Sequence, residues 1–326
     1  MSIKNISFYD IFFKKGLYRL CILVVLCIVL SIVSDVFLSW KNLINICIQA
    51  SILLILAVGA TGTILTKGID LSLAGVMSLS GCVCGYFMSS GKSPFVASIL
   101  AIFVGIAFGF LNGFLIAVVK IPAFVSTYGV KYIANGLAIM LMGSNIFFGF
   151  PQSFLNLGVG YVGPIPVITI IALLVTLVLY VFLQKSKYGR QIYCVGANST
   201  AAFYSGINTT STYLMVYVIS SLCASFAGIL QIARMNAAQA GLGDSFQMLA
   251  IASIVIGGTS MSGGEGNVVG GIIGALILTL IVNGMNLLEI TAQAQPLITG
   301  IVIVLAVLLD MQIKRIENSK IVLNKK

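Results

Sequence analysis

Apolar residues run along this chain in blocks of about 20, separated by short segments in which Lys, Arg, Gly or Pro gather. An α-helix of that length crosses about 30 Å of hydrocarbon. The pattern predicts an all-α, polytopic membrane protein of about ten transmembrane helices, at residues 17–38, 43–66, 70–90, 94–119, 122–142, 164–183, 212–233, 247–261, 267–288 and 295–312. Glycines interrupt the third and the eighth, so whether these two cross the bilayer fully stays open.

Composition supports the membrane interpretation. Hydrophobic residues make up 59% of the 326 residues and charged residues 8%, whereas a soluble domain carries about a quarter charged residues. So few charges cannot solvate a soluble surface, and membrane lipid is expected to cover much of it. A net charge of +10 would favour nucleic acid as the partner of a soluble protein. Here the basic residues lie between apolar blocks, so we expect no nucleic-acid partner.

The basic residues predict the orientation of the helices. With both termini in the cytoplasm, only Lys41, Lys92 and Arg234 of the 18 basic residues fall outside the cell, and Lys131 stays within a span. Positive charge collects on the cytoplasmic side of membrane proteins. The chain is therefore predicted to be a multi-pass membrane protein with both termini cytoplasmic. The first apolar block is followed by no small-residue cleavage site and is predicted to be an uncleaved helix.

Residues 143–163 form the longest predicted external loop. The loop carries no charge and is rich in glycine and aromatic residues. It is interpreted either as a docking surface or plug, or as an ordinary connector.

The predicted cytoplasmic loop, residues 184–211, contains a short segment punctuated by glycines. Asn198 or Ser199 can cap a short helix there that is too polar at its start to span the membrane. That helix would present Phe203 and Tyr204, either as a knob for a groove in another protein or as aromatic side chains resting on lipid.

No catalytic or metal chemistry is expected from the sequence. The chain has seven cysteines, mostly in apolar stretches, and no histidine, so neither a metal site nor a cofactor is predicted. The segment 91–93 lacks the upstream glycine of a phosphate-binding loop. The segment 241–244 matches the GxGD motif of intramembrane aspartyl proteases, which need a second aspartate in a neighbouring span. We expect no catalytic residue, and a chain that is not itself an enzyme.

Two glycine-broken segments, residues 67–81 and 257–271, predict two pseudo-repeated halves around a transport pathway. Glycines that let helices pack closely are the alternative. Asp70 in the first segment is costly in a bilayer unless it is paired, capped or in contact with water. We expect it to cap the helix that starts at Leu71, with Lys67 as an available partner, and direct contact with a solute is the alternative.

Three sequence blocks occur in a fixed order: Gly68-Ile69-Asp70-Leu71-Ser72, the segment from Gly189 to Ile207, and Gly257-Gly258-Thr259-Ser260 followed by Gly263-Gly264-Glu265-Gly266. With the spans between them, they resemble the ribose-type (simple sugar) permeases of bacterial ABC importers. The resemblance implies a single transmembrane permease domain over residues 1–326, with a core at 40–312 and a cytoplasmic coupling loop at 184–211.

The resemblance also implies partners. Such a permease forms a dimer with a second copy or a sister permease, over a cytoplasmic ABC ATPase that hydrolyses the ATP. A periplasmic or lipid-anchored binding protein delivers the sugar or sugar-like solute. The coupling loop would seat in a cleft of the ATPase through Gly189, Arg190, Tyr193, Gly196, Asn198, Ala201, Ala202, Phe203, Ser205 and Gly206. The signature residues along the pathway would be Gly68, Asp70, Ser72, Gly257, Gly258, Thr259, Ser260, Gly263 and Gly264.

Polar residues within the predicted spans are candidates for contact with sugar hydroxyls. They are Gln49, Asn112, Asn283 and Asn286. Amides of this kind also hydrogen-bond neighbouring helices, for gains of about 0.6 kcal/mol. A structural role is the favoured interpretation of each.

The chain departs from the family at two places. Many members have Glu-Leu-Asp where this chain reads Gln247-Met248-Leu249, and an arginine where it has Phe203 or Tyr204. Two alternatives from other classes stay open at this point. A secondary carrier or facilitator would share the broken helices, although such carriers usually need several intramembrane carboxylates. A membrane scaffold or sensor would leave the paired broken segments unexplained.

Overall fold

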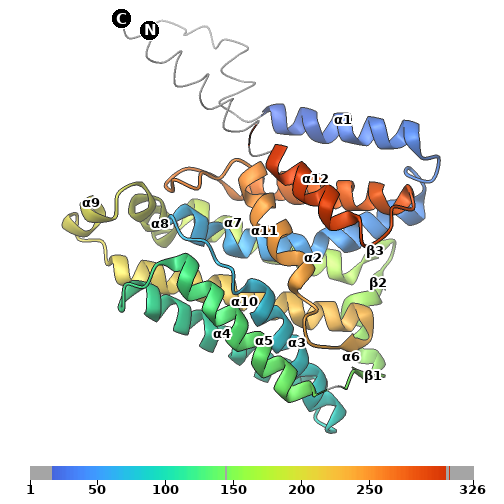
Figure 1. Ribbon diagram of the computed structural model, residues 1–326, viewed down its shortest axis with the longest axis horizontal. Helices are drawn as coiled ribbons and strands as arrows, with labels where there is room; N and C mark the ends of the chain where they lie inside the picture. The colour runs from blue at the N-terminus through green and yellow to red at the C-terminus, as the bar shows by residue number, and fades with distance from the viewer. Residues whose placement is uncertain (1–16, 144, 306–307, 309–326) are drawn as a thin grey trace, which may run out of the picture.

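The computed structural model describes residues 17–143, 145–305 and 308, and in these ranges the protein is built almost entirely of α-helices (Figure 1). In chain order they are α1 (Leu17–Val33), α2 (Trp40–Leu65), α3 (Leu73–Ser89), α4 (Pro94–Ala117), α5 (Ala123–Met142), α6 (Gln152–Val159), α7 (Val167–Lys185), α8 (Lys187–Ala197), α9 (Ser199–Tyr204), α10 (Thr209–Met235), α11 (Asp244–Ile256), α12 (Val268–Leu287) and a last helix, Gln295–Leu305. The strands have two residues each: β1 (Phe147–Phe148), β2 (Tyr161–Val162), β3 (Ile165–Pro166) and β4 (Ala237–Ala238). The all-α fold class is confirmed.

Five helices of the described part are long and apolar enough to cross a membrane: α2, α4, α7, α10 and α12. The helices α1, α3, α11 and Gln295–Leu305 are apolar but shorter, and α5 has 20 residues with Lys131 near its middle. The polytopic character is therefore confirmed, while ten crossings stay a prediction. The end of the predicted span 295–312 and the basic residues near both ends of the chain lie outside the described residues.

The helices α2 and α10 form the centre of the bundle. α10 packs against α2, α3 and α4, and α2 packs in the corresponding way against α10, α11 and α12. In Figure 1, α1 and α12 lie on one side of this centre, and α4 and α5 lie on the other. α2 is buried at every position from Ala50 to Leu65, so even its small polar residues face protein.

Small residues let α4 and α10 approach closely. α4 turns its Ala and Gly positions inward, and a Cβ built on Gly109 would lie only 2.6 Å from the Cα of Val218. The opposite face of α4 exposes Phe95, Phe103 and Phe110. Membrane helices associate through such small-residue faces because lipid provides no hydrophobic driving force between them. The aromatic face of α4 suits contact with lipid.

The second half of the chain repeats the helix order of the first. The order α2, break at residues 66–72, α3, α4 and α5 returns as α10, break at residues 236–243, α11, α12 and the last described helix. The glycine pattern had paired 67–81 with 257–271, whereas the helix order pairs 66–72 with 236–243. The break at 236–243 was not identified from the sequence. It starts at Asn236, a non-glycine residue with a φ of 51°, and its residues 237–238 form β4, which pairs with β1.

The predicted external and cytoplasmic loops lie at opposite ends of the bundle (Figure 1). β1, α6, β2 and β3 lie at one end, and α8 and α9 lie at the other. Residues 145–163 pack as a cap on their end of the bundle, with Phe147 opposite Ala238 in the antiparallel β1–β4 pair and with Phe154 buried. The backbone N–H of Phe150 also donates to the Oδ1 of Asn236 at 3.0 Å. This cap stabilises the break that precedes α11.

Candidate functional site

Asp70 lies in the break between α2 and α3 and is 1% exposed. Its Oδ1 accepts hydrogen bonds from the backbone N–H and the hydroxyl of Ser72, at 2.9 and 2.6 Å. Its Oδ2 accepts one from the hydroxyl of Ser220 on α10, at 2.7 Å. These bonds offset the cost of burying a carboxylate. They also tie the turn that begins α3 directly to the second half of the chain.

The same network reaches α4 and α5. Asn112 of α4 donates to the hydroxyl oxygen of Ser72 at 2.8 Å, and Thr127 of α5 donates to the backbone oxygen of Ile69 at 3.0 Å. Asp70 closes a local turn onto the residue two positions later, as Asp side chains often do. Ser72 is the residue at the N-cap position of α3, so Asp70 stabilises the helix start from just outside it.

Lys67 does not pair with Asp70. Its Nζ donates to the backbone oxygen of Ala197, the last residue of α8, at 3.2 Å. Lys67 has a φ of 64°, a left-handed conformation that ends α2 and turns the chain toward α3. Sequence spacing alone suggested the ion pair, and the structure gives this lysine a different partner.

The end of α2, the turn after α8 and the glycine loop at residues 257–267 meet at one place, which we name the loop junction. The backbone N–H of Gly264 donates to the backbone oxygen of Leu65 at 2.9 Å. Gly196 packs against the same carbonyl so closely that a Cβ there would collide with it. The second and third of the blocks that carried the family resemblance therefore meet at the end of α2, three residues before the first block begins.

Side chains reinforce the loop junction. The hydroxyl of Tyr193 donates to the backbone oxygen of Gly266 at 2.9 Å and accepts from the amide of Gln184 at 2.8 Å. The bond from Lys67 to Ala197 lies beside them. α8 is thus attached to the end of α2, to α7 and to the glycine loop before α12.

The glycine loop needs backbone conformations that favour glycine. The φ angles are 83°, 78°, 75° and 144° at Gly258, Gly263, Gly264 and Gly266. The backbone N–H of Ser260 closes the loop onto the oxygen of Glu265 at 2.8 Å. Gly257 crosses Gly270 of α12 with no room for a side chain on either. Thr259 is buried, with no hydrogen-bond partner for its hydroxyl among the described residues. The signature residues of this block thus shape a tight turn.

The residues predicted to contact an ATPase fall into two groups. The buried group, which docks the segment onto the helices, is Gly189, Gly196 and Ala202, with Tyr193 half-buried. The exposed group is Arg190, Asn198, Ala201, Phe203, Ser205 and Gly206. Phe203 and Tyr204 are 63% and 83% exposed, and their rings meet edge to face with centroids 5.8 Å apart. α9 therefore exposes both rings, which we call the knob, as both interpretations of the sequence require.

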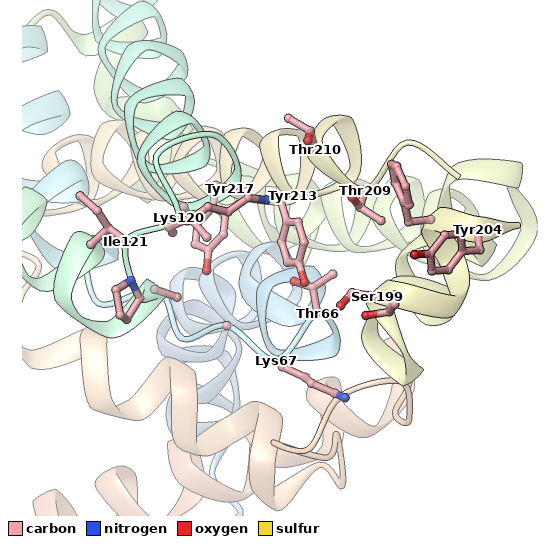
Figure 2. Close-up of a pocket in the computed structure, with 16 residues that line it drawn as sticks. Thr66, Lys67, Lys120, Ile121, Ser199, Tyr204, Thr209, Thr210, Tyr213 and Tyr217 are labelled. Atoms are coloured by element: carbon pink, nitrogen blue, oxygen red, sulfur yellow. The ribbon is translucent and has the colours of Figure 1, made fainter. Parts of the chain in front are cut away.

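A cavity of about 630 Å³ lies beside α9, between the end of α2, the α4–α5 turn and the start of α10 (Figure 2). Figure 2 shows the rings of Tyr213 and Tyr217 directed from α10 toward the end of α2, and the amine of Lys67 directed away from the cavity. Tyr217 is fully buried, and its hydroxyl has no partner in the described part of the chain. Gly68 leaves the space that this hydroxyl fills. Residues of α9, α10 and the end of α2 therefore line this cavity together, whereas Asp70 does not line it.

The four amides proposed for a solute path do not share one cavity, and none lines the cavity of Figure 2. Asn112 belongs to the network described above. Asn283 of α12 exchanges hydrogen bonds with Asn42 of α2, at 2.8 and 3.2 Å. Asn286 is exposed, and Gln49 is half-buried on α2. Asn286 also accepts from the amide of Gln295, at the start of the last described helix, at 2.9 Å. Three of the four thus join helices, which is the role favoured from the sequence.

One charged contact was missed from the sequence. Lys131 of α5 lies 3.3 Å from the carboxylate of Asp244 at the start of α11. The sequence analysis left Lys131 within a span and considered Asp244 only within a rejected protease motif. The signal that could have found the pair is Lys131 itself, because an ionisable residue within a predicted span usually has a partner.

Among the described residues, no group of three or more His, Cys, Asp or Glu side chains could hold a metal ion. What the arrangement offers instead is a mechanical connection. An exposed surface on α9 is attached, through short and rigid contacts, to the breaks that separate the long helices.

Comparison with known proteins places this geometry in a family. Residues 42–307 match the model of the branched-chain amino acid transport system / permease component family. The D-allose transport system permease protein of Escherichia coli (strain K12) is 37% identical over 286 residues, 87% of this chain and 88% of that protein. The ribose import permease protein of Bacillus subtilis (strain 168) is 37% identical over 290 residues, 88% and 90%. The galactose/methyl galactoside import permease protein of Escherichia coli (strain K12) is 32% identical over 329 residues, 95% and 98%.

These matches extend over nearly the whole length of the chain and of each relative, and they include the three blocks of the loop junction and the Asp70 turn. The resemblance inferred from those blocks is confirmed. No solved structure matches the chain. The chain therefore belongs to the family of bacterial ABC permease components that includes these sugar permeases.

Proposed function

We propose that this chain forms the membrane pathway of an ATP-driven importer for a sugar or sugar-like solute in the bacterial inner membrane. A cytoplasmic ABC ATPase drives it, a periplasmic or lipid-anchored binding protein delivers the solute, and a second copy or a sister permease completes the pathway. Both termini face the cytoplasm in this proposal. The ribose, allose and galactose relatives support a monosaccharide as the solute.

The observation that carries the proposal is the loop junction. Movement of α9 would be transmitted through the end of α8, because Gly196 packs on Leu65 and Ala197 accepts a bond from Lys67. It is passed on to the end of α2 and, through Gly264, to the loop before α12. A push by ATPase subunits on the exposed knob would therefore shift helices of both halves, as rigid-body transport cycles require.

A carrier that works without ATP is the less favoured alternative. Such a carrier gives no role to the exposed Phe203 and Tyr204 at the tip of α9. It also needs titratable groups that are free to exchange ions, whereas Asp70 is buried and hydrogen-bonded at both of its oxygens. Family membership supports the importer as well.

The proposal is tested by purifying the tagged chain in mild detergent and identifying its partners by mass spectrometry. Two variants that add one negative charge are compared with the wild type. Ala201→Asp places the charge on the exposed surface of α9. Ser93→Asp is the matched control, since Ser93 is exposed at the start of α4 and aspartate can replace serine as the N-cap of that helix.

We expect a near-stoichiometric ABC ATPase with the wild type and with Ser93→Asp, and its loss with Ala201→Asp at unchanged membrane levels. ATP-dependent uptake of D-ribose, D-allose or D-galactose by vesicles should follow the same order. A chain that purifies without any ATPase in several detergents, and takes up sugar without ATP, would establish the carrier instead.

A further inference from the structure

The Lys131–Asp244 contact lies deep within the helices. Lys131 is the ninth residue of α5, about 12 Å from the start of a helix about 30 Å long at 1.5 Å per residue. Asp244 begins α11, next to the break at residues 236–243, and Gly243 before it packs against the backbone of Ala74 at the start of α3. The pair therefore sits where the two broken segments of the chain meet.

This ion pair is not enclosed by the described residues. The Lys131 side chain is 17% exposed and the Asp244 side chain is 52% exposed. A half-exposed carboxylate at this depth cannot face hydrocarbon, because a charge at the bilayer centre costs at least about 2.5 kcal/mol. Charged residues at such depth face the interior of a helix bundle or a water-filled cavity.

The exposed face of α5 continues from this pair as a row of aromatic rings. Phe124, Tyr128 and Tyr132 follow at intervals of four residues, which places them on one helix face, and all three are exposed. Phe124 and Tyr128 stack with centroids 5.9 Å apart, and the hydroxyls of Tyr128 and Tyr132 lie 3.1 Å apart. Tyrosine combines an apolar ring with a polar end, which suits a surface between apolar and wet regions.

α5 also leaves open space beside this row of rings. A Cβ built on Gly129 or on Gly136 would meet no described atom within 4 Å. Amides lie one turn from each member of the ion pair: Asn135 is four residues after Lys131, and Gln247 is three after Asp244. The amide oxygens of both are buried without a hydrogen-bond partner in the described structure.

We infer that this face, formed by Phe124, Tyr128, Tyr132 and the Lys131–Asp244 pair, lines the water-filled pathway and contacts the sugar as it passes. The inference rests on the proposed importer function and adds the residues that meet the solute. The rings support the apolar C–H face of a pyranose or furanose ring. The ammonium donates to sugar hydroxyls and the carboxylate accepts from them. Because the two charges neutralise each other, the site suits a neutral polyol.

The first test asks whether the face is wet, without the need to know the sugar. Tyr132→Cys is compared with Phe103→Cys, whose parent residue is 69% exposed on the outer face of α4. Both are made in a chain whose exposed cysteines, Cys21, Cys47 and Cys194, are replaced by serine. Membrane vesicles are treated with a negatively charged methanethiosulfonate that does not enter lipid.

We expect the cysteine at position 132 to react at least about tenfold faster than the one at 103, because a thiol must ionise in water to react. Equal, slow reaction at both positions would overturn the inference, since it would place the α5 face against lipid or protein. Such a result alongside ATP-dependent sugar uptake would leave the importer function standing. If position 132 reacts fast but the parent chain shows no ATP-dependent sugar uptake, the importer function is overturned while the α5 face is still shown to be wet.

The second test separates solute contact from simple pairing of charges. Lys131→Gln, Asp244→Asn and the double variant are compared for thermal stability of the purified complex and for the KM of ATP-dependent uptake of D-ribose, D-allose and D-galactose. If the residues contact sugar, the double variant keeps its stability but raises KM by about tenfold, the loss of one charged hydrogen bond. A double variant with the KM of the wild type would overturn the inference.

Discussion

Ser220 and Ser221 are adjacent buried serines on α10 with opposite roles in the structure. The hydroxyl of Ser220 donates to Asp70 at 2.7 Å, whereas the hydroxyl of Ser221 has no partner among the residues described. Ser220→Ala removes a bond to a carboxylate, worth about 1.5–3 kcal/mol in soluble proteins, while interhelical bonds in membranes reach about 1.7 kcal/mol at most. The two figures agree at about 1.5 kcal/mol, so we expect Ser220→Ala to lower the free energy of unfolding by about 1.5 kcal/mol. Ser221→Ala removes no bond and should be neutral or slightly stabilising.

The assay is thermal unfolding of the detergent-solubilised chain, followed by size-exclusion chromatography of a fluorescent fusion. A loss of about 1.5 kcal/mol corresponds to a fall in Tm of about 3–6 °C. Because both variants delete one oxygen from the same helix, the change in side-chain volume is matched. Equal Tm values for the two variants would refute the assignment of Ser220 as an anchor of the Asp70 turn. A fall confined to Ser221→Ala would refute the geometry of the network altogether.

Three further predictions concern the loop junction and the knob. Gly264→Ala should prevent assembly, because its φ of 75° and a Cβ 2.8 Å from the backbone of Ala197 leave no relaxed conformation; the monodisperse fraction in size exclusion measures this. Tyr193→Phe loses the bond to the backbone oxygen of Gly266, which should lower the free energy of unfolding by about 1 kcal/mol. We expect a clear fall in ATP-dependent uptake with only a small fall in Tm. Replacing Phe203 and Tyr204 by alanine should reduce the amount of ATPase that co-purifies and leave Tm unchanged, since both side chains are exposed.

The helical blocks of this chain could be predicted closely from the sequence. The predicted segments 94–119 and 122–142 correspond to α4 and α5 within two residues at each end, because proline and charged residues bound them. Hydropathy reports length and polarity along one segment, and these are local properties. The number of membrane crossings is harder to predict from hydropathy. The helices α3 and α11 are short and lie beside a break, so the length of their apolar segments does not decide whether each crosses the membrane.

Contacts between distant segments could not be predicted in this way. Sequence spacing placed Lys67 beside Asp70, but a left-handed residue at the end of α2 directs the lysine to Ala197 instead. The Lys131–Asp244 pair joins residues from different halves, and no local pattern connects them. The motif blocks marked the right residues for the loop junction, yet their meeting at one backbone carbonyl follows only from the packed structure.

The loop junction has a consequence for how the protein is made. It joins Leu65 near the first quarter of the chain to Gly196 and to Gly264. A ribosome delivers these segments in order, at about 5–20 residues per second, so the last contact follows the first by many seconds. Until Gly264 arrives, the segment that carries α9 lacks one of its supports. A prematurely terminated chain would therefore insert into the membrane without presenting a firmly held α9, and would be a poor substrate for assembly with its partners.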